Sequence, residues 1–214
     1  MTAPTTTEPV PQINTAISAE PAAEQRPPDL REAVHTAQLW VADLLGAVGP
    51  DRLAGRTPCA DFDVETLVRH LFGVADRLVA MGGGRPAESV PPSIPALPDD
   101  VVGEYRARVE RGRAAWDDPA SLGRLVKVPF GRVPGGVVLG VYLAENLTHG
   151  WDLATATMQD PEADPGLVGP AYATMRQILP PEGREGFPFD PPVEPAAGAG
   201  PTERLANWCG RSSR

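Results

Sequence analysis

The sequence has 214 residues, of which 42% are hydrophobic, and a formal net charge of −9. This length suits one domain with its own core, and an acidic chain without a Lys/Arg cluster argues against a nucleic-acid or anionic-membrane surface. The two cysteines are too few for a disulfide framework, and no stretch approaches 18 continuous apolar residues. We therefore expect a cytoplasmic protein that does not span a membrane.

The first 28 residues are rich in Thr, Pro, Ala and Glu. They lack the basic start and apolar stretch of a secretory signal, and their composition predicts a disordered tail over residues 1–28. A single domain is then expected over 29–211. The chain has 26 prolines, well above the usual share of roughly 5%, and they cluster in the tail, around 86–98 and beyond 180, where they indicate loops.

Two amphipathic helices are expected early in the chain. Apolar residues recur at helical spacing over residues 29–48, and Asp29 is the candidate N-cap. The second helix is expected over 64–81, with Asp61 or Asp63 as its cap and a run of three glycines at its end.

The middle of the chain predicts a loop, a helix and a short hairpin. A proline-rich loop over 85–98 leads to a more polar third helix over 99–116, with Asp99 or Asp100 available as its cap. Residues 124–138 combine Val, Leu and Phe with a Pro-Gly pair, which favours a short extended hairpin.

A fourth helix is expected over 137–158 and a shorter fifth over 165–179. A Pro- and Gly-rich segment then leads to a last amphipathic turn or two at 202–210. Four substantial amphipathic helices with short or proline-rich links predict an all-α four-helix bundle. Ligand and metal sites of such bundles lie between facing helices.

The fourth helix carries a carboxylate and an imidazole where a core stripe is expected. Glu145 lies within about 40° of His149 around the helix, as do Tyr142 and Leu153. An unpaired buried carboxylate costs on the order of several kcal/mol, whereas side chains at i and i+4 can share one divalent ion. His70, at the edge of the apolar face of the second helix, would complete a two-histidine, one-carboxylate set with open positions.

Simpler interpretations stay open for each of these residues. Glu145 and His149 can share a hydrogen bond without a metal. Asp152, one turn after His149, is either an acceptor for an imidazole N–H or a solvent-facing residue. Cys59, in the loop before the second helix, is expected to be packed rather than reactive, and His35 to be a surface or core-filling residue.

Three fragments together point to a known family. They are "TPCADFDVETLVRHLFG" (57–73), "VPFGRVPGGVVLGVYLAENLTHGWDLATAT" (128–157) and "PPVEPAAGAGPTERLANWCGR" (191–211). The combination resembles the bacterial metal-binding family related to the N-terminal domain of mycothiol-dependent maleylpyruvate isomerase. This resemblance implies a DinB-like four-helix bundle with a short extra C-terminal helix.

The resemblance also implies a site and a chemistry. The metal-ligand positions of the family fall on His70, Glu145 and His149, and zinc is the usual expectation for such a set, although nickel, manganese or iron would tolerate it. A metal with an open position lowers the pKa of a bound thiol. The leading hypothesis is therefore a metal-dependent enzyme that uses a low-molecular-weight thiol, with mycothiol implied, for S-transfer to, or isomerisation of, a small electrophile. Tyr142 is a candidate proton donor or substrate-orienting residue.

Alternative functions stay open at this point. Full-length maleylpyruvate isomerases carry a C-terminal α/β domain, whereas a short Pro-, Gly- and Ala-rich segment follows the fifth helix here, so the resemblance implies the fold and metal more directly than the reaction. One alternative is a thiol-independent metal-dependent hydrolase, cyclase or isomerase of a specialised pathway. Another is a non-catalytic, metal-stabilised binding protein, in which Cys59 or Asp152 would supply a fourth ligand. The resemblance also allows a homodimer.

Overall fold

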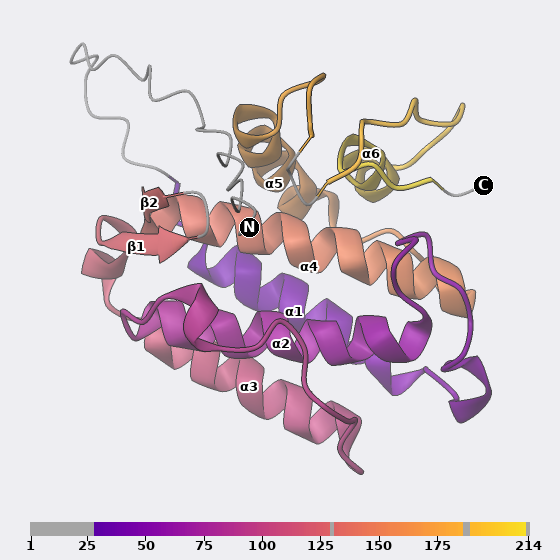
Figure 1. Ribbon diagram of the computed structural model, residues 1–214, viewed down its shortest axis with the longest axis horizontal. Coiled ribbons are helices and arrows are strands. Elements are labelled where there is room, and N and C mark those ends of the chain that lie inside the picture. The colour runs from indigo at the N-terminus through magenta and orange to yellow at the C-terminus, as the bar shows by residue number, and fades with distance from the viewer. Residues whose placement is uncertain (1–27, 129–130, 186–188, 213–214) are drawn as a thin grey trace, which may run out of the picture.

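Four helices form a bundle, which confirms the predicted fold class (Figure 1). The computed structural model describes residues 28–128, 131–185 and 189–212. The bundle helices are α1 (Arg31–Gly46), α2 (Val64–Gly82), α3 (Val101–Ala115) and α4 (Gly135–Thr157). The predicted disordered tail lies outside the described residues, except for Pro28. Among the described residues, the structure has no helix with the length and apolar character that crossing a bilayer requires.

Two further helices cover the side of α4 that faces away from α2 and α3 (Figure 1). They are α5 (Pro165–Ile178) and α6 (Pro201–Trp208), and they contact each other as well as α4. Helix α4 is therefore packed on several sides, which agrees with its nearly continuous apolar sequence.

Side-chain caps begin two of the bundle helices. Asp63 before α2 and Asp100 before α3 each accept a hydrogen bond of 2.8 Å from the backbone N–H three residues later. The prediction of Asp29 as the cap of α1 was wrong. Leu30 occupies the N-cap position without a side-chain bond, because Asp29 instead binds the backbone and guanidinium of Arg31.

The expected hairpin is present, but its Pro-Gly pair has another role. Strand β1 (Leu125–Val128) pairs antiparallel with β2 (Gly131–Pro134), in a register that places Leu125 opposite Pro134. Pro134 is also the N-cap of α4, and Gly135 is the first residue of that helix. The pair therefore joins the hairpin to α4 instead of forming the turn between the strands.

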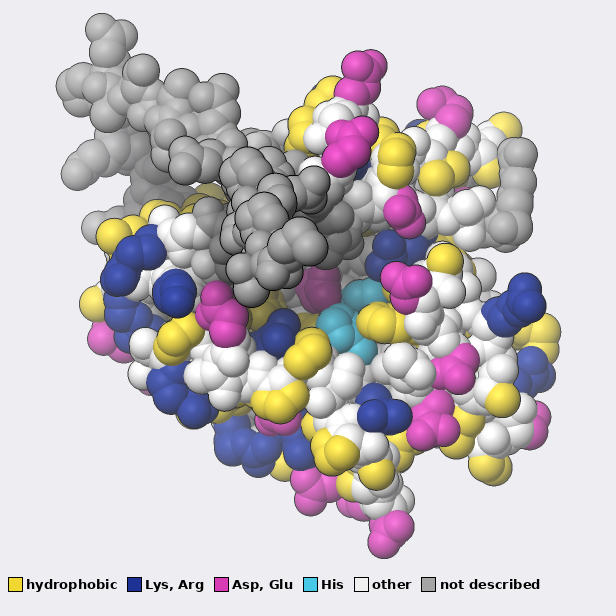
Figure 2. Space-filling view, in the orientation of Figure 1, with side chains coloured by type: hydrophobic (Ala, Val, Ile, Leu, Met, Phe, Trp, Pro, Cys, Tyr) yellow, Lys and Arg dark blue, Asp and Glu magenta, His cyan; other side chains and the backbone are white. Residues whose placement is uncertain are grey.

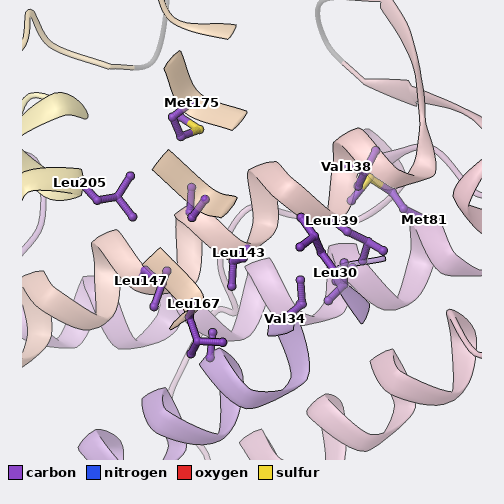
Figure 3. Packing of buried hydrophobic residues seen from close by; sticks show 14 of the residues in the cluster. Leu30, Val34, Met81, Val138, Leu139, Leu143, Leu147, Leu167, Met175 and Leu205 are labelled. Carbon is purple, nitrogen blue, oxygen red and sulfur yellow. The ribbon is translucent and has the colours of Figure 1, made fainter. Parts of the chain in front are cut away.

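The larger core cluster forms around α4 (Figure 3). Leu139, Leu143 and Leu147 project from this helix and are at most 1% exposed. The partners labelled with them include Val34 of α1, Met81 of α2, Leu167 and Met175 of α5, and Leu205 of α6. This packing fixes α4 from both sides and so positions the polar residues along it.

The proline-rich loop between α2 and α3 is held against α2. Arg69 and Arg77 each donate through Nε to a loop carbonyl, at 2.8 and 3.0 Å. Gly73 lies between them, and a Cβ at this position would collide with the backbone of Pro92. The absence of a side chain at Gly73 thus allows the loop to lie directly on the helix.

Candidate metal centre

Two helices bring the three predicted ligand residues together. His70 on α2 places Nε2 3.1 Å from Oε1 of Glu145 on α4, and Nε2 of His149 lies 3.5 Å from the same oxygen. The two imidazole rings are nearly perpendicular, with centroids 4.9 Å apart. Histidine side chains reach the surface near the middle of the face shown in Figure 2, in a hollow with acidic and basic side chains around it.

Each histidine has its other ring nitrogen occupied. Nδ1 of His70 lies 2.9 Å from the carbonyl oxygen of Pro92, and Nδ1 of His149 lies 3.0 Å from Oδ2 of Asp152. Both acceptors call for a proton on Nδ1, so Nε2 is the nitrogen that each ring offers toward Glu145. This tautomer is the one that a metal-binding histidine needs.

These distances fit a single small cation. Four ligands at 2.0–2.1 Å in tetrahedral geometry lie about 3.3 Å from one another. The two Nε2–Oε1 distances, 3.1 and 3.5 Å, are on either side of that value, and the ligand atoms of all three residues lie within 4.8 Å of one another. His70, Glu145 and His149 would therefore hold a divalent metal with little movement and leave room for an exogenous ligand.

Electrostatics at the site favour a charged pair when no metal is bound. Burial disfavours the charged form of Glu145, but His149 and His70 outweigh it and hold the pKa of Glu145 well below its ordinary value. Burial likewise works against protonation of His149, yet Glu145 and Asp152 raise the pKa of His149 to about 9. A divalent cation would supply the positive charge that the His149 proton otherwise provides.

Asp152 and Arg211 support His149 from behind. The Asp152 side chain is completely buried, and its Oδ2 also accepts a 3.0 Å bond from Nε of Arg211, which follows α6. Of the two interpretations left open for Asp152, the structure shows the acceptor of an imidazole N–H and not the solvent-facing residue. Arg211 and Pro92 were missed by sequence reasoning; a buried Asp requires a cationic partner, but only the fold identifies which arginine supplies it.

The three residues line a pocket of about 500 Å³. Phe62, from the loop before α2, lies with its ring centroid 5.1 Å from that of His70 and 6.1 Å from that of His149. The lining also includes Asp190, between α5 and α6, and Arg211, after α6. The site therefore has the volume to admit a small molecule beside a metal.

Cys59 also lines this pocket. A ligand atom of Cys59 lies within 4.8 Å of ligand atoms of His149 and Asp152, which gives a second group of three metal-binding residue types. Burial raises the pKa of the Cys59 thiol to about 11. The thiol is therefore protonated near neutral pH when no metal is present, in accord with a packed rather than reactive cysteine.

The remaining candidates, Tyr142 and His35, are not among the residues that line this pocket. Tyr142 is one turn before Glu145 and packs against the core, and burial raises the pKa of its phenol. It is absent from the described lining of the pocket, so its role as a proton donor stays a prediction. His35 on α1 pairs with Glu110 at 3.0 Å, at the surface between α1 and α3.

The fold and this arrangement define a class: DinB-like helical bundles with histidine and carboxylate groups facing one another between two helices. The chain belongs to the family described as the mycothiol maleylpyruvate isomerase N-terminal domain, whose sequence model matches residues 35–154. Two uncharacterized proteins of Mycobacterium tuberculosis, from strains CDC 1551 and H37Rv, are each 34% identical over 179 residues, covering 83% of this chain and 95% of theirs. No solved structure matches.

Proposed function

We propose that this chain is a metal-dependent enzyme that uses a low-molecular-weight thiol, mycothiol, either for S-transfer, in which the thiol sulfur bonds to an electrophilic carbon of a small substrate, or for isomerisation of that substrate. Zinc is the metal that the two imidazoles and one carboxylate suit best. The observation that carries the proposal is the convergence of both Nε2 atoms on Oε1 of Glu145, at the wall of an open pocket.

His70, Glu145 and His149 would hold the metal, which when bound lowers the pKa of a thiol at its open position. Asp152 and the carbonyl of Pro92 keep the Nδ1 protons in place, so that neither ring rotates away. Phe62 places an apolar ring beside both imidazoles, with its centroid 5.1 Å from that of His70 and 6.1 Å from that of His149.

The experiment is a turnover assay of the zinc-loaded protein with mycothiol and a panel of electrophiles that includes epoxides, activated alkenes and maleylpyruvate. We expect turnover that requires both metal and thiol and that His149→Ala abolishes. Tyr142→Phe is assayed beside it, because loss of the phenol hydroxyl lowers turnover if that group donates a proton or orients the substrate. The absence of thiol binding and of thiol-dependent turnover across the panel would contradict the proposal.

Leaving the thiol out of the assay distinguishes the proposed reaction from a thiol-independent hydrolysis, cyclisation or isomerisation at the same metal. If turnover is equal with and without thiol, a metal-activated water or a directly bound substrate explains the site better.

A second candidate function, a non-catalytic metal-stabilised binding protein, is supported by Cys59. Its ligand atom groups with those of His149 and Asp152, whereas His70 and Glu145 belong to the other group of described residues, so Cys59 would have to move toward Glu145 to saturate the metal. X-ray absorption of the zinc-loaded protein without added thiol measures this directly. A sulfur ligand that disappears in Cys59→Ser would favour the binding protein, whereas a nitrogen and oxygen shell with an exchangeable water favours the enzyme.

A further inference from the structure

A pocket separate from the candidate metal centre lies between the first half of α1 and the end of α3. It measures about 340 Å³, and no described residue lines both this pocket and the one at the metal centre. All four bundle helices contribute to it, with Val34 and Gln38 from α1, Leu78 from α2, Gly112 from α3 and Leu139 from α4. Its volume is within the range of small-molecule sites.

Gln38 brings a buried amide without a donor's partner to this pocket. The residue is 2% exposed, and its Nε2 atom has no hydrogen-bond partner among the described residues. A buried N–H that lacks an acceptor costs about 1–3 kcal/mol. Gln159, by contrast, donates through Nε2 to the carbonyl of Leu44 and the hydroxyl of Thr157, at 3.0 and 2.8 Å. Because Gln38 lines the pocket, a molecule bound there can supply the acceptor that the protein does not.

The inner walls beside Gln38 are apolar. Val34, Leu78 and Leu139 line the pocket and are each at most 2% exposed. Trp116 is buried to the same extent, and its indole N–H already donates to the carbonyl of Leu78 at 2.9 Å. The indole therefore offers the pocket an aromatic surface rather than a free donor. A single amide among such walls suits a ligand with one polar group on an apolar body.

The charged groups of the lining disfavour an anionic ligand. Arg31 pairs with Asp29 at 2.7 Å, and Arg113 pairs with Glu32 at 3.3 Å. Asp117 adds a carboxylate to the same lining, and the histidine of the lining is likewise paired with a glutamate, at 3.0 Å. Both guanidinium groups thus have a carboxylate partner already, so an anion would enter without a free cation to pair with it.

We propose that this pocket binds a small neutral molecule that carries an amide or lactam group on an apolar body. An amide is the complement of the Gln38 carboxamide, because its oxygen accepts from Nε2 and its N–H can donate to Oε1. The apolar body would pack on Val34, Leu78 and Leu139. This second binding site is separate from the metal centre and does not depend on the proposed function.

The test titrates benzamide and benzoate, which share a shape but differ in charge, into the ¹⁵N-labelled full chain and follows the resonances by NMR. Wild type is compared with Gln38→Met, which keeps the length of the side chain without its amide, and with the control Gln159→Met, outside the pocket. We expect benzamide to shift the side-chain NH₂ resonance of Gln38, which is assigned by its absence from Gln38→Met. Benzoate should bind wild type about tenfold more weakly than benzamide, because its charge finds no free partner. Gln38→Met should bind benzamide about tenfold more weakly than wild type, and Gln159→Met should bind it as wild type does.

Urea denaturation without a probe checks the state of the Gln38 amide in the same proteins. Gln38→Met should be at least as stable as wild type, because it removes a buried amide that lacks a partner. Gln159→Met should be less stable, because it loses two hydrogen bonds. The proposal is overturned if wild type does not bind benzamide at millimolar concentration, if benzoate binds equally well, or if Gln38→Met keeps the wild-type affinity for benzamide. The pocket would then hold only water, and the metal centre would be unaffected by that result.

Discussion

Oε1 of Glu145 faces the Nε2 atoms of two histidines, one from its own helix and one from α2. Such a set serves equally as a charged hydrogen-bonded cluster and as a ligand set for a divalent ion. The groups behind the histidines favour the second role. The Pro92 carbonyl binds Nδ1 of His70, and Asp152 binds Nδ1 of His149. Nε2 of each ring is therefore the atom that can bind a shared metal ion, as is typical of metal-bound imidazoles.

At the residue scale, we expect Asp152→Asn to lower zinc affinity 10- to 100-fold, the usual effect of removing an acceptor behind a metal-bound histidine. The amide keeps the shape of the side chain but no longer provides a full negative charge to His149 and Arg211. A competition titration with a chromophoric chelator measures the affinity, and Asp43→Asn, an exposed carboxylate on α1, is the control. Equal affinities in the two variants would show that Asp152 does not support the metal.

The metal-free protein should lose stability as the pH rises. The pKa of His149 is about 9 in the folded protein against roughly 6.5 in an unfolded chain. The stability that protonated His149 adds to the folded protein is therefore fully present below pH 6.5 and is lost as the pH rises through 9. The free energy of unfolding falls by at most about 3 kcal/mol over this range. Thermal melts with a chelator present, at pH 6.5 and 9, measure this loss. The His149→Gln variant should lose less stability between these two pH values. An identical loss in both proteins would contradict the charged pair of His149 with Glu145.

At the element scale, the loop between α2 and α3 is part of the site because Pro92 binds Nδ1 of His70. We expect Gly73→Ala to push this loop off α2, to destabilise the protein by about 1–3 kcal/mol and to weaken zinc binding. Urea denaturation and zinc titration measure the two effects. Gly169→Ala in α5 is the matched control, since a Cβ there meets nothing within 4 Å and alanine favours the helix. A Gly73→Ala protein as stable as that control would argue against the close packing.

The elements themselves could be predicted to a large extent from local sequence. Helical spacing of apolar residues located all of the bundle helices, and Asp63 and Asp100 were recognised as caps because capping depends on neighbours in the chain. Asp29 was misassigned because Arg31 competes for its carboxylate. The Pro-Gly pair before α4 was misread as a hairpin turn because the same residues suit a helix start.

The predicted site was less complete than the predicted fold. His70, Glu145 and His149 could be grouped because two lie on one helical face and the third is on a facing helix. The contacts of Pro92 and Arg211 with the site could not be predicted, since no local sequence pattern marks a backbone carbonyl or a distant arginine as a partner of these residues. Their contacts arise only when the loop and the residues after α6 fold against the bundle.

At the scale of the whole molecule, a metal at this site would link α2 to α4, and Asp152 would connect it through Arg211 to the C-terminal segment. A ligand that binds only the folded protein stabilises it by mass action, by about 2.7 kcal/mol at a free concentration 100 times its Kd. We therefore expect zinc to raise the Tm of the wild-type protein and a chelator to lower it. For the His70→Ala variant, which lacks one of the proposed ligands, we expect zinc to leave the Tm unchanged.

The central claim is that His70, Glu145 and His149 bind a metal, and elemental analysis of protein purified without a His tag tests it most directly. Wild type and His149→Ala are purified side by side, with circular dichroism to confirm that both are folded. The account predicts close to one equivalent of metal in wild type and almost none in the variant. No metal in either protein, together with a stability that a chelator does not change, would mean that Glu145 and the two histidines satisfy only one another.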